Sequence, residues 1–114
     1  MIVIAKNKGK KIAYTETDTV LVFGANELRL DLAEYEDDEP VHITICYNRK
    51  GKLTTGNDGF TYVAEIDIPA RKYQEVPDPE EEGSSHTEPL PLDMNYVELT
   101  LWALEEMEES ANEQ

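Results

Sequence analysis

The segment 41–47 constrains the fold most, because its side chains alternate strictly in character. Every second residue is β-branched or aromatic, and the residues between them are only mildly polar. The first set is Val41, Ile43, Ile45 and Tyr47, and the second is His42, Thr44 and Cys46. Successive side chains of a strand point to opposite faces, and such residues suit a pleated surface. We therefore expect 41–47 to be the central strand of a sheet, covered on most of both faces.

Other segments repeat the alternation. Longer strands are predicted at 19–23, 27–32, 60–68 and 96–103, and shorter ones at 1–5, 11–14, 53–55 and 71–76. Turn residues between them favour two hairpins, one joining 1–5 to 11–14 through a lysine-rich turn, the other joining 19–23 to 27–32. The late strand should pair with 60–68. Residues 1–104 are thus predicted to form a single all-β domain, an antiparallel β-sandwich or small barrel of about seven strands.

Net charge limits the function. The chain of 114 residues carries a formal charge of −15, and the acidic excess lies almost entirely after residue 56. Such a field repels nucleic acid and anionic membranes, so we expect no direct nucleic acid binding and no membrane binding. A protein partner with a basic surface is the expected alternative to a merely solubilising acidic face. The four lysines of the turn at 6–11 form either an anion site or, more commonly, a charged cluster that keeps the strand edge from pairing with another chain.

The start of the chain lacks the features of a signal peptide, and no apolar run reaches membrane-spanning length. A cytoplasmic location is therefore predicted, in a host cell or a virion. The lone Cys46 agrees with this and is expected to be a small buried thiol.

Residues 77–91 change the composition abruptly, with four prolines, a Glu80–Glu82 run and Leu90 as the one large apolar residue. We expect a flexible acidic Pro-rich loop between strands, in which His86 has no orienting partner. The acidic tail 105–114 should be helical or frayed.

Two segments together resemble small prophage-encoded proteins of unknown role. The first runs Tyr-Val-Ala-Glu-Ile-Asp-Ile-Pro-Ala-Arg-Lys-Tyr over residues 62–73. The second runs Pro-Leu-Asp-Met-Asn-Tyr-Val-Glu-Leu-Thr-Leu-Trp-Ala over residues 91–103. The resemblance covers about a third of the chain and implies a phage origin, without assigning a role to any residue.

The sequence contains no nucleophile elbow, phosphate-binding glycine loop, cysteine pair or zinc-type histidine spacing, so we predict a protein that is not an enzyme and needs no cofactor. The acidic run at 34–39 lacks the ligand spacing of a calcium loop, and a calcium-stabilised module is the least favoured hypothesis. The favoured function is a protein–protein interaction or structural adaptor module, and the alternative is an acidic mimic of nucleic acid. The candidate partner-binding residues are Trp102, Tyr96, Glu80, Glu81, Glu82, Glu105 and Glu106.

Overall fold

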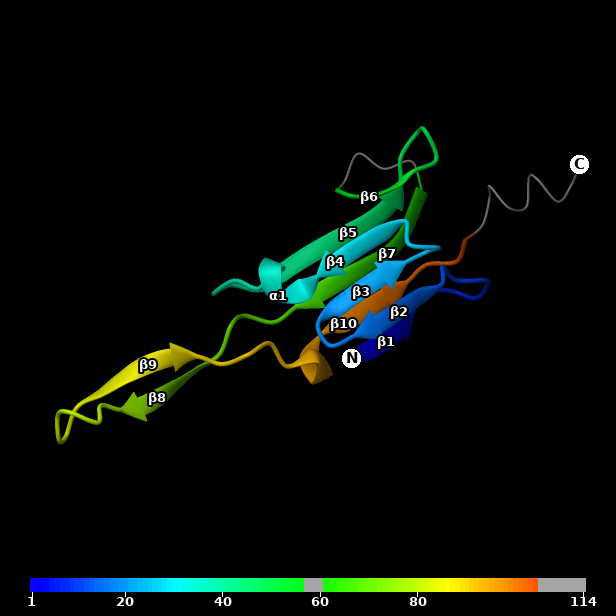
Figure 1. Cartoon of the computed structure of the whole chain (residues 1–114). Coiled ribbons are helices and arrows are strands. Elements are labelled where there is room, and N and C mark those ends of the chain that lie inside the picture. Colours follow the sequence, from blue (N-terminus) through cyan, green and yellow to red (C-terminus); the bar gives the residue numbers. More distant parts are fainter. Residues whose placement is uncertain (57–60, 105–114) are drawn as a thin grey trace, which may run out of the picture.

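The computed structural model describes residues 1–56 and 61–104, which form ten strands, one helical turn and one turn of 3-10 helix (Figure 1). In chain order they are β1 (Ile2–Ala5), β2 (Tyr14–Thr17), β3 (Val20–Phe23), β4 (Leu28–Asp31), α1 (Leu32–Tyr35), β5 (Val41–Tyr47), β6 (Leu53–Thr55), β7 (Thr61–Ile68), β8 (Tyr73–Pro77), β9 (Ser85–Pro89), η1 (Met94–Tyr96) and β10 (Glu98–Leu101).

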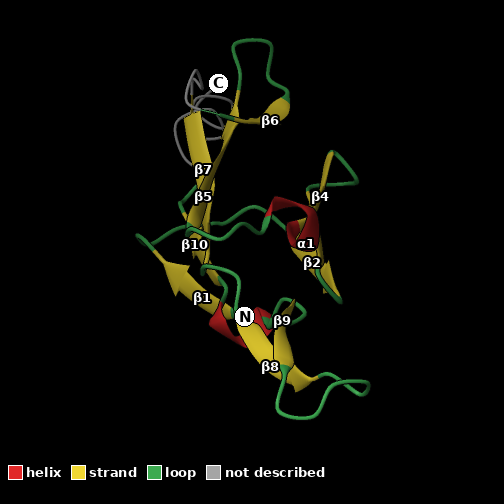
Figure 2. Ribbon diagram, turned by 90° about the vertical axis from the view of Figure 1, so that its left-hand side faces the viewer, coloured by secondary structure: helices red, strands yellow, loops and turns green. Residues whose placement is uncertain are grey.

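Two open sheets pack face to face to make the body of the molecule (Figure 2). The larger sheet has the order β1-β10-β7-β5-β6, and the smaller has the order β2-β3-β4. The all-β prediction is confirmed, and of its two versions the structure has the sandwich, since no sheet closes into a barrel. The described residues contain ten strands rather than about seven, mainly because two of them lie outside the body.

One hydrophobic core fills the space between the sheets. Leu21 and Phe23 of the smaller sheet meet Ile45, Ile66 and Leu99 of the larger, and all five side chains are fully buried. The predicted alternation of the late strand is confirmed as well. Its inward set is buried throughout, and it consists of Val97, Leu99, Leu101 and Ala103.

The predicted central position of the segment 41–47 is wrong, because β7, not β5, is the middle strand of the larger sheet. The predicted cover on both faces is met only in part, since the face opposite the core is buried at Cys46 but exposed at His42. The smaller sheet covers the core face, while His42 on the other face keeps about half of its side chain exposed. Cys46 pairs with Thr54 between Ile45 and Tyr47, so it lies on the face away from the core, yet its thiol is fully buried, and its predicted burial is confirmed.

The hairpin expected between 1–5 and 11–14 does not form. β1 pairs in parallel with β10, from Ile2 beside Glu98 to Ala5 beside Leu101. The lysine-rich turn is instead a crossover to the smaller sheet, where β2 pairs with β3. The reason is the core: Ile12, just after the turn, is buried, which directs the chain into the smaller sheet.

The flexible loop expected at 77–91 is also corrected. β8 and β9 form an antiparallel hairpin, with Val76 opposite His86. We call residues 73–89 the arm. The prolines at its strand ends, Pro77 and Pro89, do not interrupt the ladder there, which is why a proline-rich segment can still pair.

The arm projects from the body along the long direction of the molecule, which measures 74 × 24 × 21 Å (Figure 1). The predicted acidic tail, 105–114, lies outside the described residues. Within residues 1–56 and 61–104, no helix is long and apolar enough to cross a bilayer.

Candidate functional site

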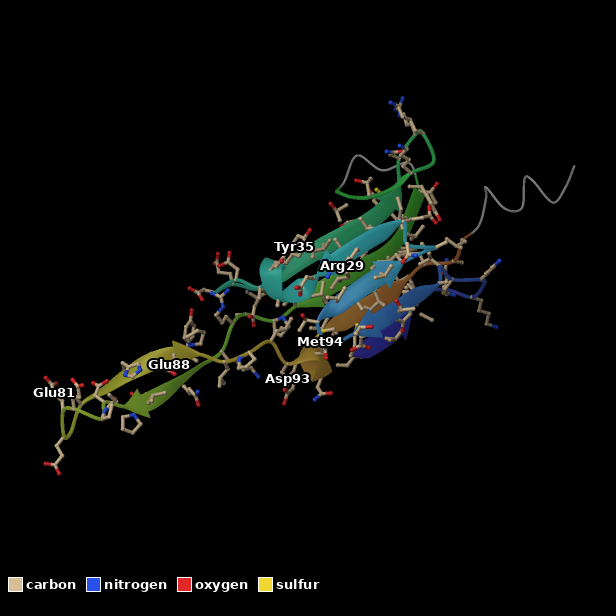
Figure 3. All side chains as sticks on the ribbon, in the orientation of Figure 1. Arg29, Tyr35, Glu81, Glu88, Asp93 and Met94 are labelled. Carbon is tan, nitrogen blue, oxygen red and sulfur yellow. The ribbon has the colours of Figure 1, made fainter. Side chains whose placement is uncertain are left out.

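The arm has no hydrophobic core of its own. None of its residues is buried, and the side chains along it point into solvent (Figure 3). Its 17 residues include six carboxylates and no lysine or arginine. A two-stranded hairpin on its own is only marginally stable in water, because it has no third strand or helix to pack against. The folding energy of the arm alone therefore gives no reason for it to project from the body.

The base of the arm is fixed to the body by Arg71 and Tyr73. The Arg71 backbone N–H donates to the carbonyl of Asp37 at 2.8 Å, and its Nη2 donates to the carbonyl of Glu36 at 2.8 Å. Its Nη1 lies 3.4 Å from Asp38 Oδ1, to which the Tyr73 hydroxyl also donates. Residues 36–38, within the acidic run at 34–39, therefore hold the base of the arm. Among the described residues no group of three or more His, Cys, Asp or Glu side chains could hold a metal ion.

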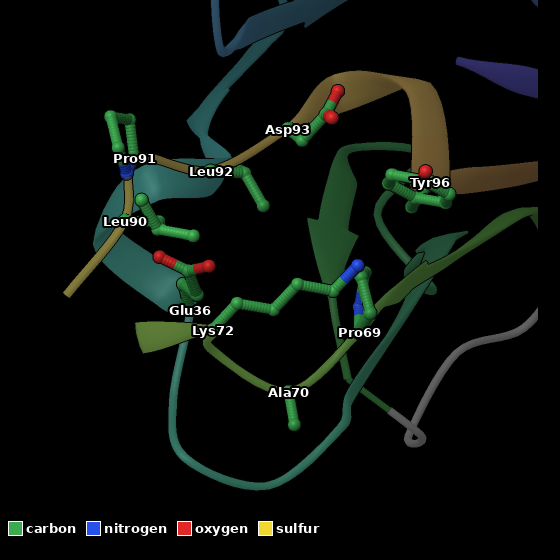
Figure 4. A pocket seen from close by; sticks show the side chains of 9 residues that line it. All are labelled: Glu36, Pro69, Ala70, Lys72, Leu90, Pro91, Leu92, Asp93 and Tyr96. Carbon is green, nitrogen blue, oxygen red and sulfur yellow. The ribbon is translucent and has the colours of Figure 1, made fainter. Parts of the chain in front are cut away.

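A pocket of about 240 Å³ lies where the arm joins the body (Figure 4). Its wall is mostly apolar, with one cation and two carboxylates at its margin. The lining residues are Glu36, Pro69, Ala70, Lys72, Leu90, Pro91, Leu92, Asp93 and Tyr96. The Lys72 ammonium lies 4.1 Å from the centre of the Tyr96 ring, a cation–π contact that helps to fix both side chains.

A second hollow, of about 230 Å³, shares Pro69 and Tyr96 with the first and extends it toward His42 and Glu98. The two hollows form a groove around Tyr96, a residue that is 55% exposed, the largest fraction among the exposed large apolar residues of the described chain. Each hollow is smaller than the roughly 300–1,000 Å³ typical of small-molecule sites. Their size suits individual side chains of a bound protein better than a cofactor.

The uncovered face of the larger sheet carries a network of charged and aromatic side chains. His42 contacts two carboxylates of β7, with Nδ1 at 2.6 Å from Asp67 and Nε2 at 3.2 Å from Glu65. The Trp102 indole N–H donates to the other oxygen of Glu65 at 2.7 Å. The Lys6 ammonium lies 5.5 Å from the centre of the Trp102 ring. The network thus joins four strands or their ends across the sheet.

The same geometry decides what His42 can do chemically. Both ring nitrogens face carboxylates, which favours the doubly protonated imidazolium. The hydrogen bond with Asp67, opposed in part by desolvation and supported by the charge of Glu65, raises the pKa of His42 above its usual value. A histidine with both nitrogens occupied in this way is poorly arranged to activate a nucleophile.

His86 has two partners that sequence reasoning missed. Its Nδ1 lies 2.5 Å from Asp78, and its Nε2 lies 2.6 Å from Glu88. The hydrogen bonds with Glu88 and then Asp78 raise the pKa of His86 as well. Glu88 stands two residues from His86 on the same strand face, a spacing that could have indicated this pair once β9 was recognised as a strand.

The predicted partner-binding residues fall into separate places. Tyr96 lies in the groove at the arm base, Trp102 lies at the other end of the uncovered sheet face, and Glu80–Glu82 form the turn at the arm tip. Glu105 and Glu106 are outside the described residues. The structure therefore connects Tyr96 and Trp102 through one sheet face, and it keeps the acidic tip apart from both.

Comparison of the chain with family models, with curated proteins and with solved structures found no match in any of the three.

Proposed function

We propose that this protein is a non-catalytic protein–protein interaction module, a structural adaptor whose phage-like sequence segments suit a role in a phage particle. The observation that carries the proposal is the arm. It is an ordered two-stranded hairpin with no buried residue of its own, bonded to the body at its base and directed away from it (Figure 1). Such an element is stabilised best when a partner covers it.

The groove beside the arm supports the same function. Aromatic side chains at partly apolar hollows are common anchors in protein interfaces, and Tyr96 occupies this position. Trp102 offers a second anchor, although its N–H is already bonded to Glu65. Polar contacts at the margin, from Lys72 and Asp93, would orient a partner that inserts a side chain beside Tyr96.

The test uses the full chain as bait in an extract of a lysogenic bacterial host. Matched baits carry either a short Gly-Ser turn in place of residues 74–88 or the substitution Tyr96→Ala. Proteins retained by the unaltered chain and lost with both altered baits are identified by mass spectrometry, and their binding is then measured with purified proteins. Retention of the same proteins by the bait without the arm would contradict the proposal.

An acidic mimic of nucleic acid is the second candidate, because the carboxylates of Glu80–Glu82 stand on an ordered turn. That turn is closed by the Asp78 N–H, which donates to the Ser84 carbonyl at 3.0 Å. A mimic binds through many carboxylates, so its affinity should fall steeply with salt, and DNA or RNA should compete for the same partner. An adaptor with apolar anchors should show neither behaviour.

A mutation pair separates the two candidates further. Charge reversal of Glu105, Glu106, Glu108 and Glu109 should abolish binding by a mimic and spare an adaptor. Trp102→Ala should weaken the adaptor more than the mimic. We expect the adaptor result, and displacement by nucleic acid together with an inactive glutamate variant would overturn it.

A further inference from the structure

The edge strand of the larger sheet exposes an unusual amount of apolar surface. β1 is the outermost strand, and within the described residues nothing pairs with its outer edge. Ile2, Val3 and Ile4 expose 46%, 47% and 39% of their surfaces. An exposed apolar edge strand is a template for another strand, and monomeric proteins usually block it.

The lysine-rich turn follows β1 directly and is held in a fixed shape. The Ala103 N–H donates to Asn7 Oδ1 at 2.8 Å, and the Leu104 N–H donates to the Lys10 carbonyl. Lys6, Lys8 and Lys10 are all exposed. Along this edge, an apolar strand is therefore followed by a cationic turn that is hydrogen-bonded to residues 103 and 104.

The arm has the complementary order. Within the described part of the chain, no further strand pairs with the outer edges of β8 and β9; each strand carries one glutamate, and the tip carries Glu80–Glu82. If β9 lies antiparallel to β1, Ser85 stands opposite Ala5 and Glu88 opposite Ile2. The acidic tip then falls beside Lys6–Lys11, and antiparallel pairing is the more stable arrangement.

The arm cannot reach this edge within one molecule, because the arm and the lysine-rich turn lie toward opposite ends of the body (Figure 1). We propose that the arm of one copy adds as a strand to β1 of a second copy, with its acidic tip on the Lys6–Lys11 turn. The contact joins different surfaces of the two copies, so it repeats head to tail and produces a ring or an open filament.

This inference rests on the proposed function, since it names one partner of the arm. The two can fail separately. The experiment below uses only the purified chain and measures self-association, whereas the extract experiment measures binding to other proteins.

The test is a charge exchange followed by sedimentation velocity at about 50 mM NaCl, where surface charges are weakly screened. Glu80→Lys, Glu81→Lys and Glu82→Lys together reverse the tip, and Lys6→Glu, Lys8→Glu and Lys10→Glu together reverse the turn. The unaltered chain should at least double its weight-average mass as concentration rises, and each triple variant alone should stay at 13.0 kDa. An equimolar mixture of the two variants should associate again, because each arm then meets a turn of opposite charge.

Two control variants carry the same charge change elsewhere. Glu16→Lys, Glu27→Lys and Glu39→Lys match the tip variant, and Arg49→Glu, Lys50→Glu and Lys52→Glu match the turn variant. Both should associate like the unaltered chain. A monomeric unaltered chain at all concentrations, association that survives reversal of the tip, or a mixture that stays monomeric would overturn the proposal. So would loss of association with the Arg49, Lys50 and Lys52 variant alone, which would move the contact to the β5–β6 turn.

Val3→Pro tests the backbone component. Since Ile2 and Lys6 donate their N–H groups to Val97 and Leu101 of the neighbouring segment, the period of two directs the Val3 N–H away from β10. Proline removes that outward donor, so self-association should be lost while far-ultraviolet circular dichroism retains the sheet spectrum. Association equal to that of the unaltered chain would show that β1 does not receive the arm.

Discussion

At the scale of single residues, the two histidines share one arrangement. His42 and His86 each lie between two carboxylates, and the pKa of each is raised, chiefly by a hydrogen bond with Asp67 for His42 and with Glu88 for His86. A raised pKa in the folded state means that the interaction stabilises the protein fully below about pH 6.5 and is lost as pH rises through the folded-state pKa. Both side chains are well exposed, so solvent screens the effect on stability.

We therefore predict that His42 titrates above 6.5 in the folded protein. Asp67→Asn should lower its titration midpoint, because the strongest bond to the imidazolium is weakened. The midpoint of His86 should not move, since its partners lie on the arm. Ring-proton chemical shifts followed by NMR from pH 5 to 9 measure both histidines in one sample. A His42 midpoint unchanged by Asp67→Asn would contradict the geometry.

Gly9 illustrates a different residue-scale constraint. Its φ is +132°, and a Cβ at this position would lie 2.8 Å from Ala103 Cβ. Gly51 also has a positive φ, of +78°, but open space around it. Gly9→Ala should destabilise the protein by about 2 kcal/mol or more, and Gly51→Ala by about 1 kcal/mol. Urea unfolding measures both, and equal losses would show that the contact with Ala103 does not matter.

At the scale of elements, the arm and the body depend on different interactions. The body is held by a core shared between two sheets, whereas the arm is held by one ladder and by the contacts of Arg71 and Tyr73 at its base. Elements with few buried contacts open locally at low free energy, without unfolding the rest.

Replacement of residues 74–88 by a short Gly-Ser turn should therefore leave the melting temperature within about 2 °C of the original value, because no core residue is removed. Differential scanning calorimetry measures the effect. A matched control is Leu99→Ala in β10, which opens a cavity in the core and should cost about 2–5 kcal/mol. Loss of cooperative unfolding on removal of the arm would show that the arm belongs to the folding unit.

At the scale of the whole molecule, the net charge is the property that most affects how stability depends on salt. The net charge of −15 must repel itself, and the repulsion is screened to a distance of about 8 Å at physiological salt. The melting temperature of dilute protein should rise from about 10 to 150 mM NaCl. Calcium and magnesium chloride at equal ionic strength should raise it equally. A much larger rise with calcium would indicate a calcium site and would support the hypothesis of a calcium-stabilised module.

Much of the strand pattern follows from the sequence, because alternation is a local property. The strand predicted at 27–32 has a leucine at every second position, and two of these, Leu30 and Leu32, are buried. The hairpin of β3 and β4, and the pairing of β7 with β10, are also as predicted. In each case the apolar side chains on one face of the strand determine which face lies toward the core, independently of which strands pair with it.

The candidate site could be predicted only in part. Tyr96 and Glu80–Glu82 are among the residues that the sequence predicts to bind a partner. The groove beside Tyr96 could not be predicted, because its walls come from segments around 36, 69 and 92 that only the folded chain brings together. The hydrogen bonds from Arg71 to the 36–38 loop could not be predicted either, because they join residues 33 or more positions apart and leave no local sequence pattern.

Strand order and the arm required the tertiary structure, for one physical reason. Backbone groups pair with any edge of suitable geometry, so the choice among edges depends on which arrangement buries the whole apolar set. The burial of Ile12 takes the chain away from β1 and into the smaller sheet, which leaves β1 to pair with β10. The arm shows the converse: the short strand predicted at 71–76 overlaps β8, but its partner β9 forms within 77–91, where side-chain composition predicts a loop.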